Sequence, residues 1–304
     1  MSPETHPQDA LAGLRKWRLE RDDESDPDGR VYRDKAGTIY HSVTRILSAT
    51  APPHQQAALQ RWLSRPSSED ERLLASQRGT LAHNHAEYLL KTARKIATHA
   101  ANKRGAWVLR CAACGHSASH KKFGLNGECP SCAPEGRSDG LICPPRSLTT
   151  YGLQKAIEGA PRPAWSASGF ARGLRHWIEA NVTAIHAVEF SIHHPAGFAG
   201  SADGLLDVGG TLSIVDFKTT KASIHQNSDS KEARLHSYRH QLGGYSLGLR
   251  HLTGIDVPQG VIVTARRTGA PEITVLDKAQ LLKAEDDFLE RVGRYFLALD
   301  PPFM

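Results

Sequence analysis

The sequence predicts an α/β fold in which a central mixed sheet is flanked by helices. Helical patterning recurs up to residue 181, and three strand-like runs follow it directly. A helix, two further strand-like runs and a closing amphipathic helix complete the chain. Strands and helices in this order assemble into one sheet with helices on its faces. A chain of 304 residues is long enough for one large domain or two modest ones.

The N-terminal half is predicted to be mainly helical. Residues 38–47 indicate a short strand that leads into a helix, with Ser42 or Thr44 as its N-cap. Apolar residues then recur at helical spacing in three segments, 55–63, 71–97 and 148–181.

The C-terminal half is predicted to form the sheet. Alternating apolar residues mark three consecutive strands, 184–192, 199–208 and 211–218. The elements expected after them are a helix, two strands and a helix, at 230–249, 259–265, 271–276 and 277–299.

Composition separates an inserted module from the rest of the chain. Residues 102–147 are rich in Lys, Gly, Cys, Ser and Pro and contain few large apolar residues. We therefore expect a polar arm, a helical part of the core, a metal-binding insertion and the remaining core, at 1–37, 38–101, 102–147 and 148–304.

Charge and hydropathy narrow the class of protein. A net charge of +6 and a pI near 9.1 favour a polyanionic partner. No apolar run is long enough to span a bilayer, and the polar start does not resemble a signal peptide. We expect a cytoplasmic protein, in a bacterium or a phage-infected host, that does not bind membranes.

Four cysteines in the insertion have the spacing of a metal site. Cys111, Cys114, Cys129 and Cys132 form the pattern C-x₂-C-x₁₄-C-x₂-C, which can close a tetrahedral Zn²⁺ shell. Such an apolar-poor segment depends on metal to fold, so we predict structural zinc. The sequence assigns no role to Cys143.

Basic and aromatic side chains are interleaved around these cysteines, and they suit a phosphate backbone and stacked bases. Arg110, Lys121 and Lys122 are the candidate DNA contacts. The alternative is that they only solvate a small module.

The stretch 200–221, GSADGLLDVGGTLSIVDFKTTK, places charges on a predicted buried hairpin. A two-residue turn at Gly209 and Gly210 suits the positive φ that such turns need. That register sets Asp203 opposite Asp216, with Lys218 on the same face as Asp216.

Like charges opposite one another destabilise a sheet, so the two carboxylates either share a proton or hold a cation. The alternative is an ordinary network of ion pairs around Lys218. Asp207 has the same parity as Asp203 but lies beside the turn, and we expect it to face solvent.

The pattern Gly-x-x-Asp203 followed by Asp216-x-Lys218 resembles the PD-(D/E)xK nuclease superfamily, in its RecB-like and phage-type exonuclease branch. The resemblance covers roughly residues 38–95 and 184–265 and excludes the zinc-ribbon-like insertion. It implies a restriction-endonuclease-like core.

Three further segments resemble the same branch. Gln241 and Tyr245 match a Q-x-x-x-Y motif whose spacing puts both side chains on one helix face, where they contact DNA or support the active site. The run from Arg78 to His83 resembles an R-G-T-x-x-H segment whose histidine is a metal ligand. Residues 42–47, SVTRIL, resemble a segment that helps to build the fold or the strand channel.

Two neighbouring residues leave alternatives open. Glu189 resembles an acidic residue that acts at the metal or its waters, although an exposed strand carboxylate would fit the same pattern. His85 could replace His83 as a ligand, but the two lie about 200° apart around a helix and cannot both face the site.

The resemblance implies a catalytic role for Asp203, Asp216, Lys218 and Glu189. One or two Mg²⁺ or Mn²⁺ ions would be held by Asp203, Asp216, His83 and the Phe217 backbone carbonyl. Lys218 would position or deprotonate the attacking water and offset charge on the scissile phosphate.

Some relatives in this branch carry an iron–sulfur cluster, with one cysteine before the nuclease core and three after it. Here every cysteine precedes the catalytic hairpin, which favours zinc.

The expected function is that of a metal-dependent DNA exonuclease that leaves 5′-phosphates, in recombination, repair or phage DNA processing. The alternatives are a structure- or site-specific endonuclease and a non-catalytic, zinc-dependent DNA-binding protein. No G-x-x-x-x-G-K-[ST] pattern occurs, so a helicase or recombination partner would be a separate chain. The sequence gives no polarity, strand preference, processivity or oligomeric state.

Overall fold

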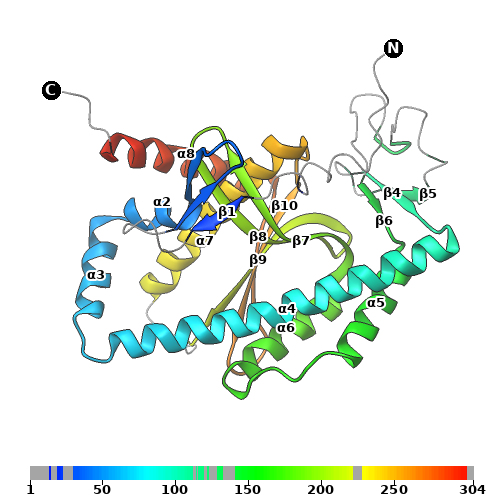
Figure 1. The fold of residues 1–304 in the computed structure, drawn as a ribbon, viewed down its shortest axis with the longest axis horizontal. Helices are drawn as coiled ribbons and strands as arrows, with labels where there is room; N and C mark the ends of the chain where they lie inside the picture. The colour runs from blue at the N-terminus through cyan, green and yellow to red at the C-terminus, as the bar shows by residue number, and fades with distance from the viewer. Residues whose placement is uncertain are drawn as a thin grey trace, which may run out of the picture.

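The computed structural model describes residues 14, 19–22, 30–111, 114, 116–119, 122, 129–132, 141–221 and 228–299, with backbone alone at 228–230. Its main feature is one large sheet with strands in the order β1-β2-β3-β8-β9-β10-β11 and β7 paired to β8. Figure 1 shows helices packed on both sides of this sheet. The predicted α/β fold with a mixed sheet and flanking helices is confirmed.

The central strands are the predicted consecutive runs, each slightly longer than expected. They are β7 (Val182–His194), β8 (Phe198–Val208) and β9 (Thr211–Thr220), and they pair antiparallel. β10 (Gln259–Arg266) joins β9 in parallel, and β11 (Glu272–Leu276) closes that edge antiparallel.

The N-terminal strands extend the other side of the sheet. β1 (Glu20–Asp22), β2 (Val31–Arg33) and β3 (Ile39–Ser42) form an antiparallel ribbon, and β3 pairs in parallel with β8. Parallel pairs on both sides of an antiparallel centre make the sheet mixed.

The β8–β9 turn has the predicted register. Gly209 and Gly210 have φ of 58° and 94°, and the pairing runs from Val208–Thr211 to Gly204–Val215. Positive φ at both turn residues is what a tight hairpin requires and glycine supplies without strain.

Two helical layers cover the sheet. On one side lie α4 (Ser68–Arg104), α5 (Arg146–Glu158) and α6 (Ser168–Asn181), and on the other α2 (Val43–Ala49), α7 (Ser228–Thr253) and α8 (Lys278–Leu299). Successive residues of β9 serve the two layers in turn. Ile214 packs toward α7 and α8, whereas Phe217 packs toward α4 and α6.

The start of α2 follows its sequence signal. Ser42 is the N-cap of α2, and its Oγ accepts the Arg45 N–H at 3.0 Å. The short α3 (Pro53–Leu63) connects α2 to α4 and buries none of its residues. α4 crosses almost the whole width of the molecule, from α3 at one end to a small second sheet at the other (Figure 1).

The second sheet, in the order β5-β4-β6, lies inside the segment predicted to be an insertion. It consists of β4 (Val108–Arg110), β5 (Ser117–Ser119) and β6 (Leu141–Cys143). None of the described helices combines the length and the apolar character needed to cross a membrane.

Candidate active site

The candidate site lies where β8 and β9 part. Pairing between the two strands ends at Gly204–Val215, one step before Asp203 and Asp216. The Asp203 Oδ2 instead accepts the backbone N–H of Phe217 at 2.6 Å. The side chain thus satisfies a donor that a strand carbonyl would otherwise bond, and both carboxylates stay buried in the parted strands.

Lys218 and His83 complete the charged cluster. The Lys218 Nζ lies 2.6 Å from the Asp216 Oδ2, and the His83 Nδ1 lies 3.6 Å from the Asp203 Oδ2. The Lys218 ammonium also lies 5.2 Å from the centre of the Tyr238 ring, a cation–π contact that sequence reasoning missed. A strand, a second strand and a long helix therefore converge on one point.

The structure distinguishes the two histidines of α4. The His83 ring makes an edge contact with Phe217 at 6.3 Å between centroids and reaches the Asp203 carboxylate. His85 is buried on another face of α4, where burial and the nearby Arg175 lower its pKa. Of the two, only His83 faces the candidate site.

Gln241 and Tyr245 lie behind Asp216 on α7. The Gln241 Nε2 donates to the Tyr245 Oη at 2.6 Å and lies 3.5 Å from the Asp216 Oδ1. Both side chains are buried, so their position favours support of the site over direct contact with DNA. An added Cβ at Gly200 would lie 2.6 Å from the Tyr245 ring, which links the Gly-x-x-Asp and Q-x-x-x-Y segments by packing.

Glu189 lies beside Asp203 in an unusual backbone conformation. Its φ is 48°, the left-handed region, between the β7–β8 pairs of Val188 and Phe190. The Ser201 hydroxyl donates to its carboxylate at 3.2 Å. Burial, with the charges of Asp203 and Glu87, raises the pKa of Glu189 to about 7.

Glu87 is a second acidic neighbour that sequence reasoning missed. It lies one helical turn after His83 on α4, so the i,i+4 relation to His83 was the signal that could have found it.

The cluster is short of positive charge. Burial raises the pKa of Asp216 to about 6 even though Lys218 opposes that shift. Burial disfavours the charged form of Asp203 as well, but hydrogen bonding to His83 and the charge of Lys218 bring its pKa below the usual value. Burial likewise opposes the charge of Lys218, yet Asp216 and Asp203 hold its pKa above the usual value.

These residues fit a divalent cation by their chemistry. Carboxylate oxygens and an imidazole are ligands that Mg²⁺ and Mn²⁺ accept, and a cation would relieve the crowding of carboxylates. In the described part of the chain, however, the four cysteines are the group whose ligand atoms all lie within 4.8 Å of one another. The carboxylates of the candidate site are turned toward Phe217 and Lys218 instead.

The cysteine cluster has the geometry of a closed metal shell. The Sγ atoms of Cys111 and Cys132 lie 3.5 Å apart, and those of Cys114 and Cys129 lie 3.6 Å apart. Four thiol sulfurs at these distances fit one tetrahedral Zn²⁺ ion.

One expectation about the hairpin is wrong. Asp207 does not face solvent: it is buried, and its carboxylate lies 2.6 Å from the Arg110 Nε and 3.0 Å from the His186 Nε2. Arg110, a candidate DNA contact of the insertion, is buried with it and also donates to Ser117, a position that favours a structural role. Arg110 lies on β4 and Asp207 on β8. No pattern in the sequence predicts a contact between segments so far apart in the chain.

The other candidate DNA contacts of the insertion are placed in part. Lys122 is exposed. Lys121 lies outside the described residues.

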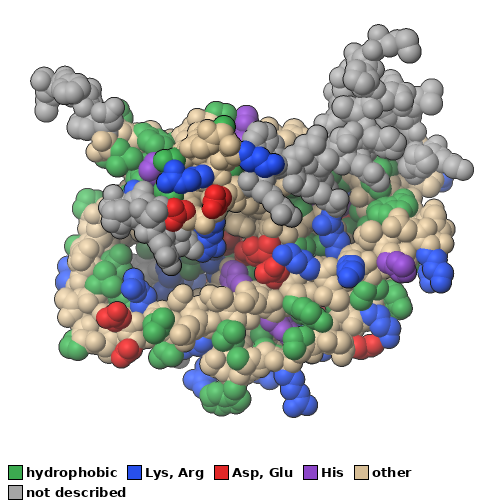
Figure 2. Space-filling model, in the orientation of Figure 1, with side chains coloured by type: hydrophobic (Ala, Val, Ile, Leu, Met, Phe, Trp, Pro, Cys, Tyr) green, Lys and Arg blue, Asp and Glu red, His purple; other side chains and the backbone are tan. Residues whose placement is uncertain are grey.

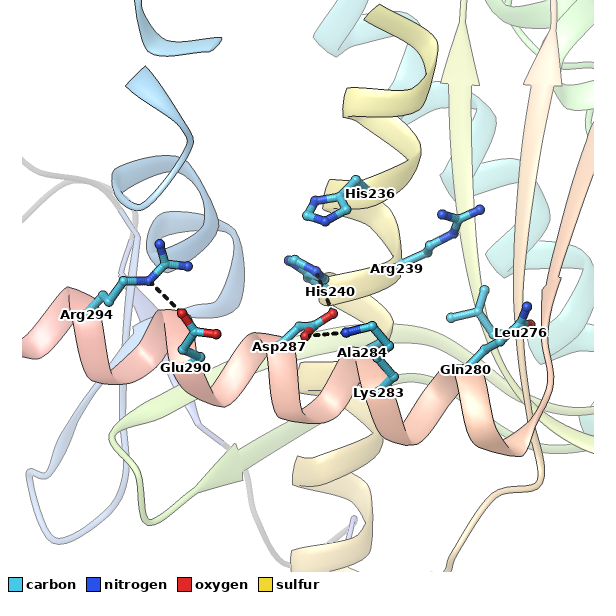
Figure 3. Close-up of a pocket in the computed structure, with 10 residues that line it drawn as sticks. All are labelled: His236, Arg239, His240, Leu276, Gln280, Lys283, Ala284, Asp287, Glu290 and Arg294. Atoms are coloured by element: carbon cyan, nitrogen blue, oxygen red, sulfur yellow. Dashed lines mark hydrogen bonds and ion pairs between the residues drawn. The ribbon is translucent and has the colours of Figure 1, made fainter. Parts of the chain in front are cut away.

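A separate cavity of about 510 Å³ lies between α7 and α8 (Figure 3). Its acidic side chains are already paired, Asp287 with Lys283 and His240, and Glu290 with Arg294. The charges that line this cavity are therefore paired, in contrast to the crowded carboxylates of the candidate site.

A family comparison agrees with this geometry. The PD-(D/E)XK nuclease superfamily matches residues 144–298, just over half of the chain. The chain belongs to the PD-(D/E)XK nuclease superfamily. No curated protein matches the sequence closely enough to count as a relative.

Membership of the PD-(D/E)XK superfamily indicates metal-dependent cleavage of nucleic acid. The matched region contains Asp203, Asp216 and Lys218 together with Gln241 and Tyr245. His83 and the four cysteines lie before it, so their roles in this PD-(D/E)XK nuclease rest on the geometry described above.

Proposed function

We propose that this PD-(D/E)XK nuclease is a Mg²⁺- or Mn²⁺-dependent DNA exonuclease of the RecB-like branch that leaves 5′-phosphates. The supporting observation is the convergence of Asp203, Asp216, Lys218 and His83 where β8 and β9 part. Buried carboxylates beside a lysine are costly in a purely structural role, because burial penalises each charge.

His83, Asp203, Asp216 and the Phe217 carbonyl would hold the cation. A divalent ion there lowers the pKa of water and stabilises negative charge that develops on a phosphate. Asp203 and Asp216, which here contact the Phe217 N–H and Lys218, would have to turn toward the ion to hold it, and Lys218 would then be free to face the substrate.

Lys218 then acts as a positively charged hydrogen-bond donor. Its raised pKa keeps it protonated at neutral pH, so it suits positioning the attacking water and offsetting charge on the scissile phosphate. Lys218 is the most exposed of the three hairpin residues, with 18% of its side chain accessible against 2% for Asp216 and 12% for Asp203.

Glu189 is the better candidate for accepting a proton. A carboxylate whose pKa is about 7 matches the operating pH of a general base, and Ser201 fixes its orientation. Gln241 and Tyr245 hold the Asp216 side of the site in place from α7.

The test compares the wild type with Lys218→Ala on end-labelled linear and on circular DNA, single- and double-stranded, with Mg²⁺, Mn²⁺ or EDTA. We expect the wild type to degrade linear DNA with a divalent ion, and Lys218→Ala to be slower by a factor of about 100 or more. Lys155→Ala is the matched control, because Lys155 forms an exposed ion pair with Glu158 on α5.

Each outcome separates the candidates. Cutting of circular DNA would replace the exonuclease with an endonuclease. Equal behaviour of wild type and Lys218→Ala under every metal condition would leave a DNA-binding protein without catalysis.

A further inference from the structure

A long groove follows the C-terminal half of α4. It encloses about 960 Å³, and we call it the α4 groove. Its basic lining residues are Lys91, Arg94, Lys95, His99, Lys103 and Arg104. Figure 2 shows Lys and Arg side chains following this part of α4 from an acidic group near the centre of the face.

The α4 groove begins at the candidate active site. Val188, which lines it, immediately precedes Glu189 on β7. Lys91, at the same end, pairs with Glu87, whose charge acts on Glu189. The basic residues of the groove and His83 therefore lie on one continuous helix, α4.

The other end of the groove reaches the cysteine module. Lys103 and Arg104 are the last residues of α4, and β4 with Cys111 follows within a few residues. At 1.5 Å per residue, the helix axis from His83 to Lys103 is ~30 Å long. A strand with the 3.4 Å spacing of a duplex would place roughly nine phosphates along that length, and a more extended single strand fewer.

The charge of the α4 groove is unbalanced. None of the described residues that line it is acidic, in contrast to the cavity between α7 and α8. Within the described chain, Lys95, Lys103 and Arg104 enter no ion pair, and all three are exposed. Three exposed cations outside any ion pair, on a lining without acidic residues, are suited to a polyanion.

One aromatic side chain selects the kind of polyanion. Tyr151 of α5 borders the α4 groove with 44% of its surface exposed. An exposed ring beside a basic track is the arrangement on which unpaired bases stack, whereas paired bases keep their faces covered.

We propose that the α4 groove binds a single DNA strand along its backbone, with a base on Tyr151, between the active site and the cysteine module. This inference rests on the proposed function for the identity of the polymer. It assigns new positioning residues, Lys95, Lys103, Arg104 and Tyr151, which act on binding at a distance from the reacting phosphate.

The test is equilibrium binding of a fluorescent single-stranded 20-nucleotide DNA in EDTA, where no cleavage occurs, at several salt concentrations. The variant Lys95→Ala/Lys103→Ala/Arg104→Ala removes three cations. We expect the slope of log affinity against log salt to fall by about 2, and affinity at 0.1 M salt to fall on the order of 100-fold. The matched control Lys35→Ala/Lys283→Ala/Arg294→Ala removes three exposed cations outside the groove and should bind like the wild type.

Tyr151→Ala tests the stacking step. We expect it to weaken binding of the single strand about 5- to 100-fold while binding of heparin stays unchanged. Equal loss for DNA and heparin would overturn the assignment of a stacked strand.

Cleavage assays distinguish failure of the inference from failure of the proposed function. If the wild type cleaves DNA and the groove variant binds and cleaves like the control, the inference is wrong and the nuclease stands. If the groove variant loses binding while the wild type never cleaves, the groove is a DNA site and the proposed catalysis is wrong.

Discussion

Gly200 is a glycine because the ring of Tyr245 occupies the space where a side chain would lie. A Cβ at this position would be 2.6 Å from the Tyr245 Cε1, closer than carbon atoms approach one another. Tyr245 in turn accepts the hydrogen bond from Gln241 behind Asp216. Glycine at this position thus lets α7 pack closely against the hairpin that carries the candidate site.

Gly200→Ala should therefore disturb stability and activity together. We expect about 1–3 kcal/mol less free energy of unfolding, from overpacking against the ring. Urea unfolding measures it, and the double variant with Tyr245→Leu should recover part of the loss. An unchanged unfolding midpoint in Gly200→Ala would contradict the packing argument.

Asp207 is the other residue whose role depends on a distant partner. Its carboxylate lies between Arg110 of the insertion and His186 of β7, and all three side chains are buried. Asp207→Ala leaves the Arg110 guanidinium buried without its counter-charge, so we expect a loss of about 3–5 kcal/mol in unfolding free energy. The exposed ion pair between Lys155 and Glu158 offers the control, since Glu158→Ala should lower the free energy of unfolding by only about 0–1 kcal/mol. Equal effects of the two substitutions would contradict a buried anchor.

Among the helices, α7 and α8 pack closely against one another. Gly243 of α7 faces α8 so closely that an added Cβ would lie 2.3 Å from the Ala284 carbonyl oxygen. Gly293 of α8 has no atom within 4 Å of its own hypothetical Cβ. Glycine is therefore required by close packing at position 243 of α7, whereas position 293 of α8 has room for a side chain.

Alanine at the two positions should act in opposite directions. Gly243→Ala pushes α7 and α8 apart, and we expect it to lower the free energy of unfolding by about 1–3 kcal/mol. Gly293→Ala should raise it by about 0.5–1 kcal/mol, because alanine is the better helix former. Thermal or urea unfolding of both variants measures the difference, and the same sign for both would refute it.

The α7–α8 contact also makes stability depend on pH. Burial lowers the pKa of His240 to about 4, and Arg291 contributes to that shift. The unfolded chain takes up a proton near the ordinary value of 6.5, so this contribution to stability is full above that pH and is lost as pH falls toward 4. His240→Gln should flatten the decline between pH 7 and pH 5 in urea unfolding, whereas His54→Gln on the exposed α3 should leave it unchanged.

The whole molecule joins a nuclease core to the cysteine module through α4 and the Asp207–Arg110 contact. Among its described residues, the module has a small apolar cluster of its own around Leu109, Cys111 and Cys129. We expect metal binding by the four thiolates to add to the stability of this segment, because closing one shell around an ion contributes folding free energy.

Metal analysis tests this directly. We expect about one zinc per chain by elemental analysis, and a value near zero for Cys129→Ser. Cys143→Ser is the control that should keep its zinc, because Cys143 is not part of the four-sulfur cluster. Iron with visible absorbance, or full zinc in Cys129→Ser, would overturn the assignment.

Local patterns in the sequence were sufficient for the central strands β7 to β11, for most of the helices and for the hairpin register, but they missed β1 and β2 in the predicted polar arm and the small sheet of the insertion. The double glycine needs positive φ, and alternation along β9 sends Ile214 and Phe217 to opposite layers, so both could be predicted from neighbours in the chain. The cysteine spacing indicated a metal cluster for the same reason. Only the tertiary structure decided the parting of β8 and β9, the choice of His83 over His85, and the burial of Asp207 with Arg110. Those outcomes depend on which distant elements pack together. Contacts between distant segments decide which side chains are buried and which charges are paired, and they produce no periodic pattern in the sequence.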